Sequence, residues 1–284
     1  MVIGAGPTGV ELAGAMSEVA QHALREDFRV INPAEARVML IEGLDRVLPT
    51  YPPSLSAEAL KALRERGVEV RLDTRVTRID DDAVLMGDEL VGARTVVWAA
   101  GVAASPLAKS LGAPLDRAGR VKVDEALRVP GHPEVFVLGD LASVLQDGAP
   151  VPGVAQAALQ GGEQTALNVM RAIRGQVLEP FAYTDLGSMA TIGRNDAVAV
   201  LGKAQFSGFF AWLMWLFVHV MALVGFRNRL AVIFSWAWSY VTFNRGSRLI
   251  TRKVSPTLLA HDDDDQPGAR QTTGDGSTAA TSKA

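Results

Sequence analysis

The stretch MVIGAGPTGVELAG, residues 1–14, decides the fold. Its first three residues are apolar, as in a buried strand, and they run directly into Gly4, Gly6 and Gly9. A helical pattern follows from about Val10 to Arg25. Glycines at this spacing permit a tight turn, let the backbone approach a pyrophosphate, and bring the helix close to the sheet. The N–H groups at the helix start then face the phosphates. The stretch predicts a dinucleotide-binding loop, and the alternative is a tight strand-to-helix turn that binds nothing.

A carboxylate stands where a dinucleotide fold needs one. Val38–Ile41 reads as a second buried strand, and Glu42 follows it directly. An acid at this position can bind both ribose hydroxyls, and it repels a 2′-phosphate, so Glu42 favours NAD(H) over NADP(H). The interval from Gly9 to Glu42 exceeds the usual spacing of about 20 residues. We therefore expect the first helix and its loop to be extended.

Strand and helix signals alternate along the first hundred residues, which indicates an α/β fold. Ser56 is expected to cap a helix that ends before Gly67. A second α/β portion contains the strand Val135–Leu138, which runs into Gly139-Asp140, and a helix from about Val154 to Arg174. Further strands are expected at Val68–Leu72, Val76–Ile79, Ala83–Met86, Thr95–Ala99, Val121–Val123, Ser188–Ile192 and Ala197–Leu201.

Composition excludes several classes of protein. The 284 residues include no cysteine, which excludes a disulfide framework, a thiolate zinc site, an iron–sulfur cluster and thiol redox chemistry. The net charge of −3 gives no reason to expect a nucleic-acid partner, and we expect no metal site. The chain is long enough for one large domain or two ordinary ones. It shows no internal repeat and no signal peptide.

The segment 197–260 has a different composition from the rest. It contains no Asp or Glu, but seven Lys or Arg, four of the five Trp and seven of the ten Phe. Such a segment is typical of helices that lie in a membrane surface. The alternatives are a spanning helix over Phe206–Phe226, which has about the 20 residues that a span needs, and a buried core or dimer contact. His219 is interpreted as a packed histidine. The expected anchor residues are Trp212, Trp215, Arg227, Arg229, Trp236, Trp238, Arg245 and Arg248.

A series of motifs makes the family resemblance specific. GAGPTGVELAG (4–14), VVWAAGV (96–102), VFVLGD (135–140) and GVAQAALQGG (153–162) together resemble the two-dinucleotide-binding flavoprotein superfamily, a Rossmann-like α/β fold. YTDLGSMATIGR (183–194) and the segment 225–250 narrow the resemblance to type II NADH:quinone oxidoreductases, over about residues 1–252. The resemblance implies FAD and NAD(H) as cofactors. It implies electron transfer from NADH through flavin to a membrane quinone, without proton pumping. It further implies a monotopic protein on the cytoplasmic face of a bacterial inner membrane, and it leaves a homodimer open.

The resemblance also assigns residues. Gly139 and Asp140 match the second FAD motif, with Asp140 near the flavin ribitol. Gln156 and Gln160 lie one helical turn apart in the family's AQxAxQ motif, which begins at Ala155, and can hydrogen-bond a quinone carbonyl; an ordinary polar stripe is the alternative. The N-terminus of this helix points positive partial charge at the flavin. Glu11 is interpreted as lying beside the nicotinamide, and a solvated helix acid is the alternative. The implied NADH site comprises Gly4, Gly6, Pro7, Thr8, Gly9, Glu42 and Gly101.

One family motif does not occur in this sequence. Members of the family carry an earlier glycine motif that binds the ADP half of FAD. We therefore expect an N-terminally truncated flavoprotein that holds FAD poorly or not at all, and the alternative function is a non-catalytic, membrane-associated nucleotide-binding remnant. Disulfide reductases and sulfide:quinone reductases are excluded because they use catalytic cysteines. The expected domains are 1–99 for NAD(H), 100–178 for the C-terminal part of the FAD domain, 179–260 for a strand pair and membrane-anchoring helices, and 261–284 for a disordered acidic tail.

Overall fold

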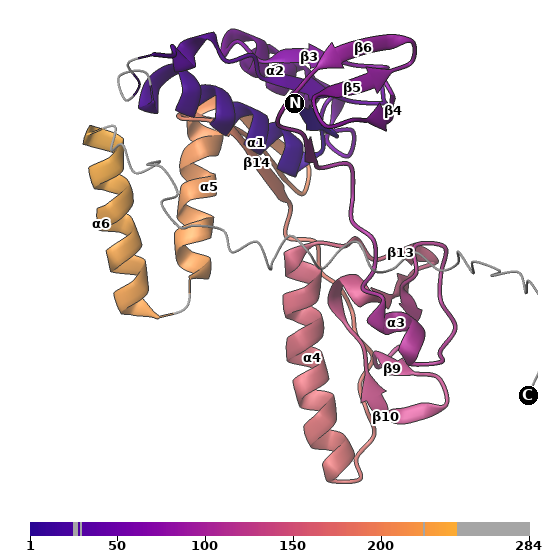
Figure 1. Ribbon diagram of the computed structural model, residues 1–284. Helices are drawn as coiled ribbons and strands as arrows, with labels where there is room; N and C mark the ends of the chain where they lie inside the picture. The colour runs from indigo at the N-terminus through magenta and orange to yellow at the C-terminus, as the bar shows by residue number, and fades with distance from the viewer. Residues whose placement is uncertain (25–27, 29, 224, 243–284) are drawn as a thin grey trace, which may run out of the picture. The chain divides into compact units, whose positions relative to one another are not determined.

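A four-stranded parallel sheet, ordered β3-β2-β1-β7, forms the first layer of the computed structural model, which describes residues 1–24, 28, 30–223 and 225–242 (Figure 1). In register, Val2 lies beside Leu40 and Val97. The side chains of β1 and β2 are all buried, because a parallel sheet is covered on both faces. The strands are β1 (Val2–Ile3), β2 (Met39–Ile41), β3 (Glu69–Arg71) and β7 (Val97–Trp98).

Two helices cover one face of this sheet. α1 (Pro7–Glu18) continues as a π-helix over Val19–Ala23, and α2 (Pro53–Glu65) follows β2 after a loop, with a short 3₁₀ helix at Pro33–Glu35 preceding β2. Both helices begin at a proline, whose fixed φ suits the first helical position. α1 therefore starts three residues before the expected Val10, and the expected end at Arg25 lies outside the described residues.

The prediction that Ser56 caps the second helix is wrong. α2 begins three residues earlier, at Pro53, so Ser56 lies inside its first turn. The Ser56 side chain is buried and its hydroxyl donates a hydrogen bond to the carbonyl of Leu48 at 3.1 Å. The expected end of the helix is confirmed: Arg66 is the C-cap, and Gly67 follows with φ +75°, a conformation that glycine adopts without strain.

A three-stranded antiparallel meander covers the other face of the sheet. β4 (Val76–Ile79), β5 (Ala83–Met86) and β6 (Glu89–Gly92) pair in sequence order. Val84 and Met86 of β5 pack against Ile3 and Ile41, which gives this face its own apolar core.

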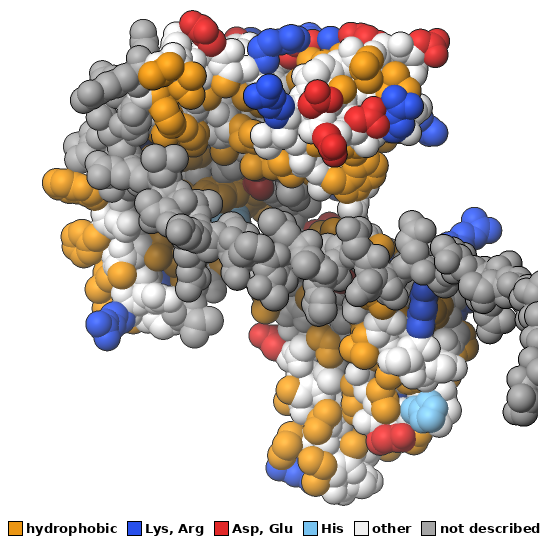
Figure 2. Space-filling view, viewed as in Figure 1, with side chains coloured by type: hydrophobic (Ala, Val, Ile, Leu, Met, Phe, Trp, Pro, Cys, Tyr) orange, Lys and Arg blue, Asp and Glu red, His pale blue; other side chains and the backbone are white. Residues whose placement is uncertain are grey.

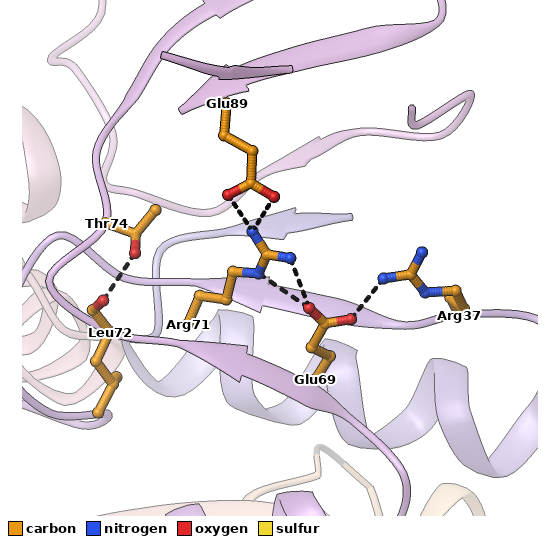
Figure 3. Close-up of polar contacts among 6 residues, drawn as sticks. All are labelled: Arg37, Glu69, Arg71, Leu72, Thr74 and Glu89. Atoms are coloured by element: carbon orange, nitrogen blue, oxygen red, sulfur yellow. Dashed lines mark hydrogen bonds and ion pairs between the residues drawn. The ribbon is translucent and has the colours of Figure 1, made fainter. Parts of the chain in front are cut away.

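A charge network also joins the meander to the edge strand β3 (Figure 3). The guanidinium of Arg71 donates to Glu69 at 2.9 Å and to both carboxylate oxygens of Glu89 on β6, at 2.9 and 2.8 Å. Arg37 donates to the other Glu69 oxygen at 2.7 Å. These hydrogen bonds lower the pKa of Glu69, first through Arg37. The charged residues thus occupy the edge of the sheet, where an unpaired apolar strand would invite aggregation.

The second α/β portion consists of short strands and one long helix, α4 (Ala155–Ile173). Val121, Val129 and Val137 form its small core. The expected strand over 135–138 lies earlier, at His132–Phe136, because residues 139–141 turn into a 3₁₀ helix. Its elements before α4 are α3 (Leu107–Ser110), β8 (Val121–Lys122), β9 (Arg128–Val129), β10 (His132–Phe136), β11 (Ala142–Ser143), β12 (Leu145–Gln146) and β13 (Ala149–Pro150).

A second three-stranded antiparallel sheet lies between α1 and the apolar helices. It consists of β14 (Ser188–Gly193), β15 (Asp196–Leu201) and β16 (Ala204–Ser207), and β16 was not expected from the sequence. Side chains of β15 alternate between two cores: Val198 packs toward α1 and α2, whereas Ala197 and Ala199 pack against Ala211. Period-two alternation of this kind is what a strand between two layers requires.

Two helices end the described part of the chain, α5 (Gly208–Ala222) and α6 (Phe226–Thr242) (Figure 1). α5 starts at Gly208 instead of Phe206, because Phe206 and Ser207 belong to β16. Among the described residues, no helix combines the length and the apolar character that crossing a bilayer demands. The expected anchor residues Arg245 and Arg248, and the expected acidic tail, lie outside the described residues.

Candidate functional site

The glycine loop between β1 and α1 is built by close backbone contacts. A Cβ on Gly4, where φ is +99°, would lie 2.6 Å from Cα of Ala100, and one on Gly9 would lie 1.8 Å from the Gly4 carbonyl oxygen. Both glycines therefore serve the packing of the loop itself. Gly6 differs, because a Cβ there would have no atom within 4 Å. Among the residues that the structure describes, the space beside Gly6 is therefore open to a ligand, and α1 has no side-chain cap at its N-terminus.

Glu42 reaches back to this loop from the end of β2. One of its carboxylate oxygens accepts a hydrogen bond from the backbone N–H of Ala5 at 2.6 Å, and the other accepts from Leu44 N–H at 3.0 Å. The loop after β3 supports Glu42, because Thr74 N–H donates to the Glu42 carbonyl at 2.9 Å. Figure 3 shows how the Thr74 hydroxyl is fixed in turn by the Leu72 carbonyl, at 2.7 Å. The structure thus brings the predicted acid and the predicted glycines together.

Gly101 lies at the same edge of the sheet. It follows β7, the parallel neighbour of β1, and has φ +101°, and a Cβ on it would have no atom within 4 Å. The carboxyl ends of β2, β1 and β7 therefore present Glu42, Gly4 and Gly101. Open α/β sheets bind ligands at the carboxyl ends of their strands. An unobstructed glycine, an uncapped helix N-terminus and a carboxylate fit the pyrophosphate and ribose of NAD(H).

The two acids of α1 tie the helix to the second sheet. A carboxylate oxygen of Glu11 accepts from the backbone N–H of Thr191 at 3.1 Å and from its hydroxyl at 3.4 Å, and Glu18 accepts from Arg194 N–H at 3.2 Å. Burial raises the pKa of Glu11. Burial, followed by the charge of Glu11, raises the pKa of Tyr51 to about 12. Glu11 is therefore a half-buried acid beside a buried tyrosine, with a structural contact that the sequence did not indicate.

A second candidate site surrounds Gly139 and Asp140, at a cavity of about 210 Å³. Gly139 has φ +64°, and a Cβ there would meet the Cβ of Ala158 on α4 at 3.3 Å. Gly153 lies beside Asp140, because its own Cβ would be 3.4 Å from the Asp140 carboxylate. A carboxylate, two glycines and the uncapped N-terminus of α4 fit the polyol and ring edge of a flavin cofactor.

Gln156 and Gln160 lie on α4, as expected, and both side-chain amides contact backbone. Gln156 donates to the Gly187 carbonyl at 2.8 Å and accepts from Leu186 N–H at 3.0 Å. Gln160 donates to the carbonyl of Thr184 and accepts from its N–H, both at 2.9 Å. The sequence motif identified these two glutamines, but it did not predict that they bind the backbone of residues 184–187.

The aromatic residues of α5 and α6 divide into two groups. Trp215 stacks on Trp236 with ring centroids 6.0 Å apart, and Trp212 lies 5.8 Å from the ring of Tyr240, so these pairs join the two helices. Trp238 is 65% exposed. Of the arginines, Arg227 is exposed, whereas Arg229 donates to the Leu223 carbonyl at the end of α5. Among the described residues of the two helices, further exposed rings that the sequence did not single out are those of Phe209, Phe210, Phe217, Phe226 and Phe234.

The parallel sheet, the glycine loop and the terminal carboxylate define a dinucleotide-binding protein. Residues 1–162 match the family model described as pyridine nucleotide-disulphide oxidoreductase, and residues 186–245 match the one described as the NDH2 C-terminal domain. The chain belongs to the pyridine nucleotide-disulphide oxidoreductase family. This confirms the expected Rossmann-like flavoprotein fold.

Type II NADH:quinone oxidoreductases are among its relatives, as the motifs predicted. The chain is 44% identical over 268 residues to the type II NADH:quinone oxidoreductase NdhA of Mycobacterium tuberculosis, covering 89% of this chain and 56% of that protein. It is 42% identical to the enzyme Ndh of the same organism, covering 88% and 56%. The chain therefore spans about half the length of these curated relatives. The solved structure of NDH2 from Plasmodium falciparum in complex with NADH shares the fold, with a TM-score of 0.75 and 17% identity, over 84% of this chain and 65% of that one.

Proposed function

We propose that this chain provides the NADH site and part of the flavin site of an NADH:quinone oxidoreductase that does not pump protons. The observation that carries the proposal is the meeting of Gly4, Glu42 and Gly101 at one edge of the parallel sheet, beside the open space at Gly6. The names of the relatives, type II NADH:quinone oxidoreductases, support the reaction.

In this proposal, the backbone from Gly6 to Gly9, with Pro7 and Thr8 between them, binds the NADH pyrophosphate. The helix N-terminus favours negative charge there, and Gly6 has no side chain to hold the phosphates away. Glu42 accepts hydrogen bonds from the ribose hydroxyls, while its contacts with Ala5 and Leu44 fix its orientation. A 2′-phosphate would meet this carboxylate directly, so NADPH is the poorer substrate.

A bound FAD would supply the chemistry of hydride acceptance from NADH and two-electron transfer to quinone. Three features of this chain would hold it: Asp140 would accept a hydrogen bond from a ribitol hydroxyl, Gly139 would permit close approach, and the first turn of α4, from Ala155, would direct positive partial charge at the ring. Glu11 lies on the nicotinamide side, where its half-buried carboxyl can hold a proton. Water exclusion by the surrounding apolar walls completes the role of the protein.

The quinone is proposed to approach the first turns of α4, at the face that carries Gln156 and Gln160. Quinones dissolve in the bilayer, so the site must open toward lipid. The exposed rings of α5 and α6 support attachment to a membrane surface: Figure 2 shows apolar side chains along the outer side of α6, and neither helix contains an acid. We place the protein on the cytoplasmic face of a bacterial inner membrane, either alone or as a homodimer.

The visible absorption spectrum of the chain, purified in mild detergent with FAD added, tests the proposal. After free FAD is removed, we expect the fraction of flavin that stays bound, however small, to bleach when NADH is added and to regain its absorption when a soluble quinone is added. Glu42→Ala should retain the flavin spectrum but need more NADH for bleaching. A chain that binds neither FAD nor NADH would overturn the proposed function.

A further inference from the structure

Residues 179–187 form an extended segment without a strand partner. This segment connects α4 to β14, and it contains no regular secondary structure. Backbone N–H and C=O groups nevertheless need hydrogen-bonding partners, and in a sheet the neighbouring strand supplies them. Here side-chain amides supply partners for four of the N–H groups and four of the C=O groups, whereas Phe181 N–H donates to the backbone carbonyl of Glu125 at 2.7 Å.

Four amide side chains repeat along α4 at every fourth residue. Gln156, Gln160, Gln164 and Asn168 occupy this row, which we call the amide row. Four residues of helix rise about 6.0 Å, and two residues of extended chain span about 6.6 Å. A helix that presents an amide every four residues can therefore meet every second residue or so of an extended segment that runs beside it.

The contacts follow this geometry, with the segment running antiparallel to α4. Asn168, which is fully buried, accepts from Glu179 N–H at 3.0 Å and donates to the Glu179 carbonyl at 2.8 Å. Gln160 makes the same pair of bonds to Thr184, and Gln156 bonds Leu186 and Gly187. Asn168 and Gln160 thus reproduce the paired N–H and C=O contacts that a neighbouring strand would make to one residue, and Gln156 divides its pair between two consecutive residues. Gln164 departs from the pattern, because it only donates to the Glu179 carbonyl, at 3.5 Å.

A fifth amide completes the arrangement from a different element. Gln146 lies on β12, and its side chain accepts from Tyr183 N–H at 2.7 Å and donates to the Tyr183 carbonyl at 3.1 Å. Tyr183 and Thr184 are therefore held from two sides, by Gln146 and by Gln160. The segment then enters β14, where Thr191 bonds Glu11 of α1.

We propose that the amide row acts as a substitute strand that fixes residues 179–187, and that Gln156 and Gln160 are positioning residues. They act through the backbone of residues 184–187, which forms one wall of the face where we propose that quinone approaches. The role in quinone reduction rests on the proposed function; the pairing itself does not.

The test is amide hydrogen exchange of the intact chain, measured without NADH or quinone. Gln160→Met keeps the side-chain volume but removes both hydrogen bonds, and we expect exchange at Thr184 and Leu186 to accelerate about tenfold or more. Gln146→Met should accelerate exchange at the same two sites, although Gln146 lies outside α4. The matched control is Gln176→Met, because Gln176 is an exposed glutamine just beyond α4; it should leave exchange unchanged.

The double variant Gln146→Met/Gln160→Met gives a second readout, because both side chains act on one segment. We expect the loss of exchange protection in the double variant to be smaller than the sum of the losses in the two single variants. In the flavin-loaded protein, both single variants should lower kcat with quinone and leave NADH oxidation by a soluble acceptor nearly unchanged. Unchanged exchange at Thr184 in Gln160→Met, whatever the activity, would overturn the substitute strand. Normal kcat in Gln146→Met, together with a raised quinone KM in Gln160→Met alone, would show direct contact with quinone and overturn the positioning role.

Discussion

Replacing Gly9 and Gly6 by alanine separates the two uses of glycine in the nucleotide loop. A Cβ on Gly9 would lie 1.8 Å from the Gly4 carbonyl oxygen, and the atoms must move from 1.8 Å to at least 3.0 Å, a shift of 1.2 Å. Both partners are backbone, so the start of α1 must move away from β1. Overpacking of this kind costs about 1–3 kcal/mol, and the better helix propensity of alanine returns about 0.8–1.0 kcal/mol.

Because the clashing carbonyl is backbone and cannot rotate away, the expected net loss of stability for Gly9→Ala is the upper end of this difference, about 2 kcal/mol. This corresponds to a decrease in Tm of about 4–8 °C for a chain of this size. Gly6→Ala is the matched control. Gly6 has φ −66°, and a Cβ there would have no atom within 4 Å. The free energy of unfolding of Gly6→Ala should therefore stay within about 1 kcal/mol of that of the parent. Its new methyl group would instead occupy the space for the pyrophosphate, and NADH affinity should fall at least about tenfold.

Thermal unfolding by circular dichroism and NADH titration by fluorescence measure the two quantities on the same samples. A Gly9→Ala chain with the parental Tm would show that the close approach of α1 to β1 is not rigid. A Gly6→Ala chain that binds NADH normally would show that the open space is not the nucleotide site.

Three further predictions concern other parts of the molecule. Glu42→Ala should raise the dissociation constant for NADH about tenfold and reduce the preference for NADH over NADPH. An unchanged NADH affinity in the titration would contradict the contact between Glu42 and the ribose. Burial raises the pKa of Glu11 above its ordinary value of 4.5, so the folded protein loses stability as the pH rises from 4.5 through the raised pKa. The difference in stability between Glu11→Gln and the parent should therefore favour the variant more at pH 8 than at pH 4. Urea unfolding curves that give the same stability difference at both pH values would refute this. The double variant Phe217→Glu/Phe234→Glu should weaken binding to anionic vesicles in a flotation assay by about tenfold or more. The control Leu167→Glu, on α4, should bind the vesicles like the parent, and an equal loss in both variants would exclude α5 and α6 as the attachment surface.

Local signals predicted the geometry of the glycine loop and of the acid beside it, because these parts obey rules that the sequence displays. The glycines of the loop lie within six residues, and Glu42 directly follows an apolar strand. The helix starts were harder to place: Ser56 has the side chain of a cap, but Pro53 sets the first turn, and burial of Ser56 follows from packing against Leu48. The sequence around Ser56 alone does not contain that contact.

The parts that sequence patterns missed depend on contacts between distant residues. β16 is short and half polar, so no alternation distinguishes it from a loop. The amide row has a visible period of four residues, but a row of glutamines on a helix usually faces solvent. Only the position of residues 179–187 reveals what the amides bind. Likewise, the sequence predicts Trp212 and Trp215 as membrane anchors. Their ring contacts with Tyr240 and Trp236 of α6 depend on the packing of α5 against α6, which the sequence pattern does not display.

The contact of α1 with β14 has a consequence for how the chain folds. Glu11 and Thr191 are 180 residues apart in sequence, and a Cβ on Gly14 would lie 1.8 Å from the Ile192 carbonyl oxygen. The face of α1 that packs against β14 therefore stays uncovered on the ribosome until the β14–β15 hairpin has emerged. Contacts of such long range close slowly, and an uncovered helix face is a site of aggregation in the meantime. Chaperone dependence during synthesis should accordingly end abruptly once the hairpin is made, well before the last helix is complete.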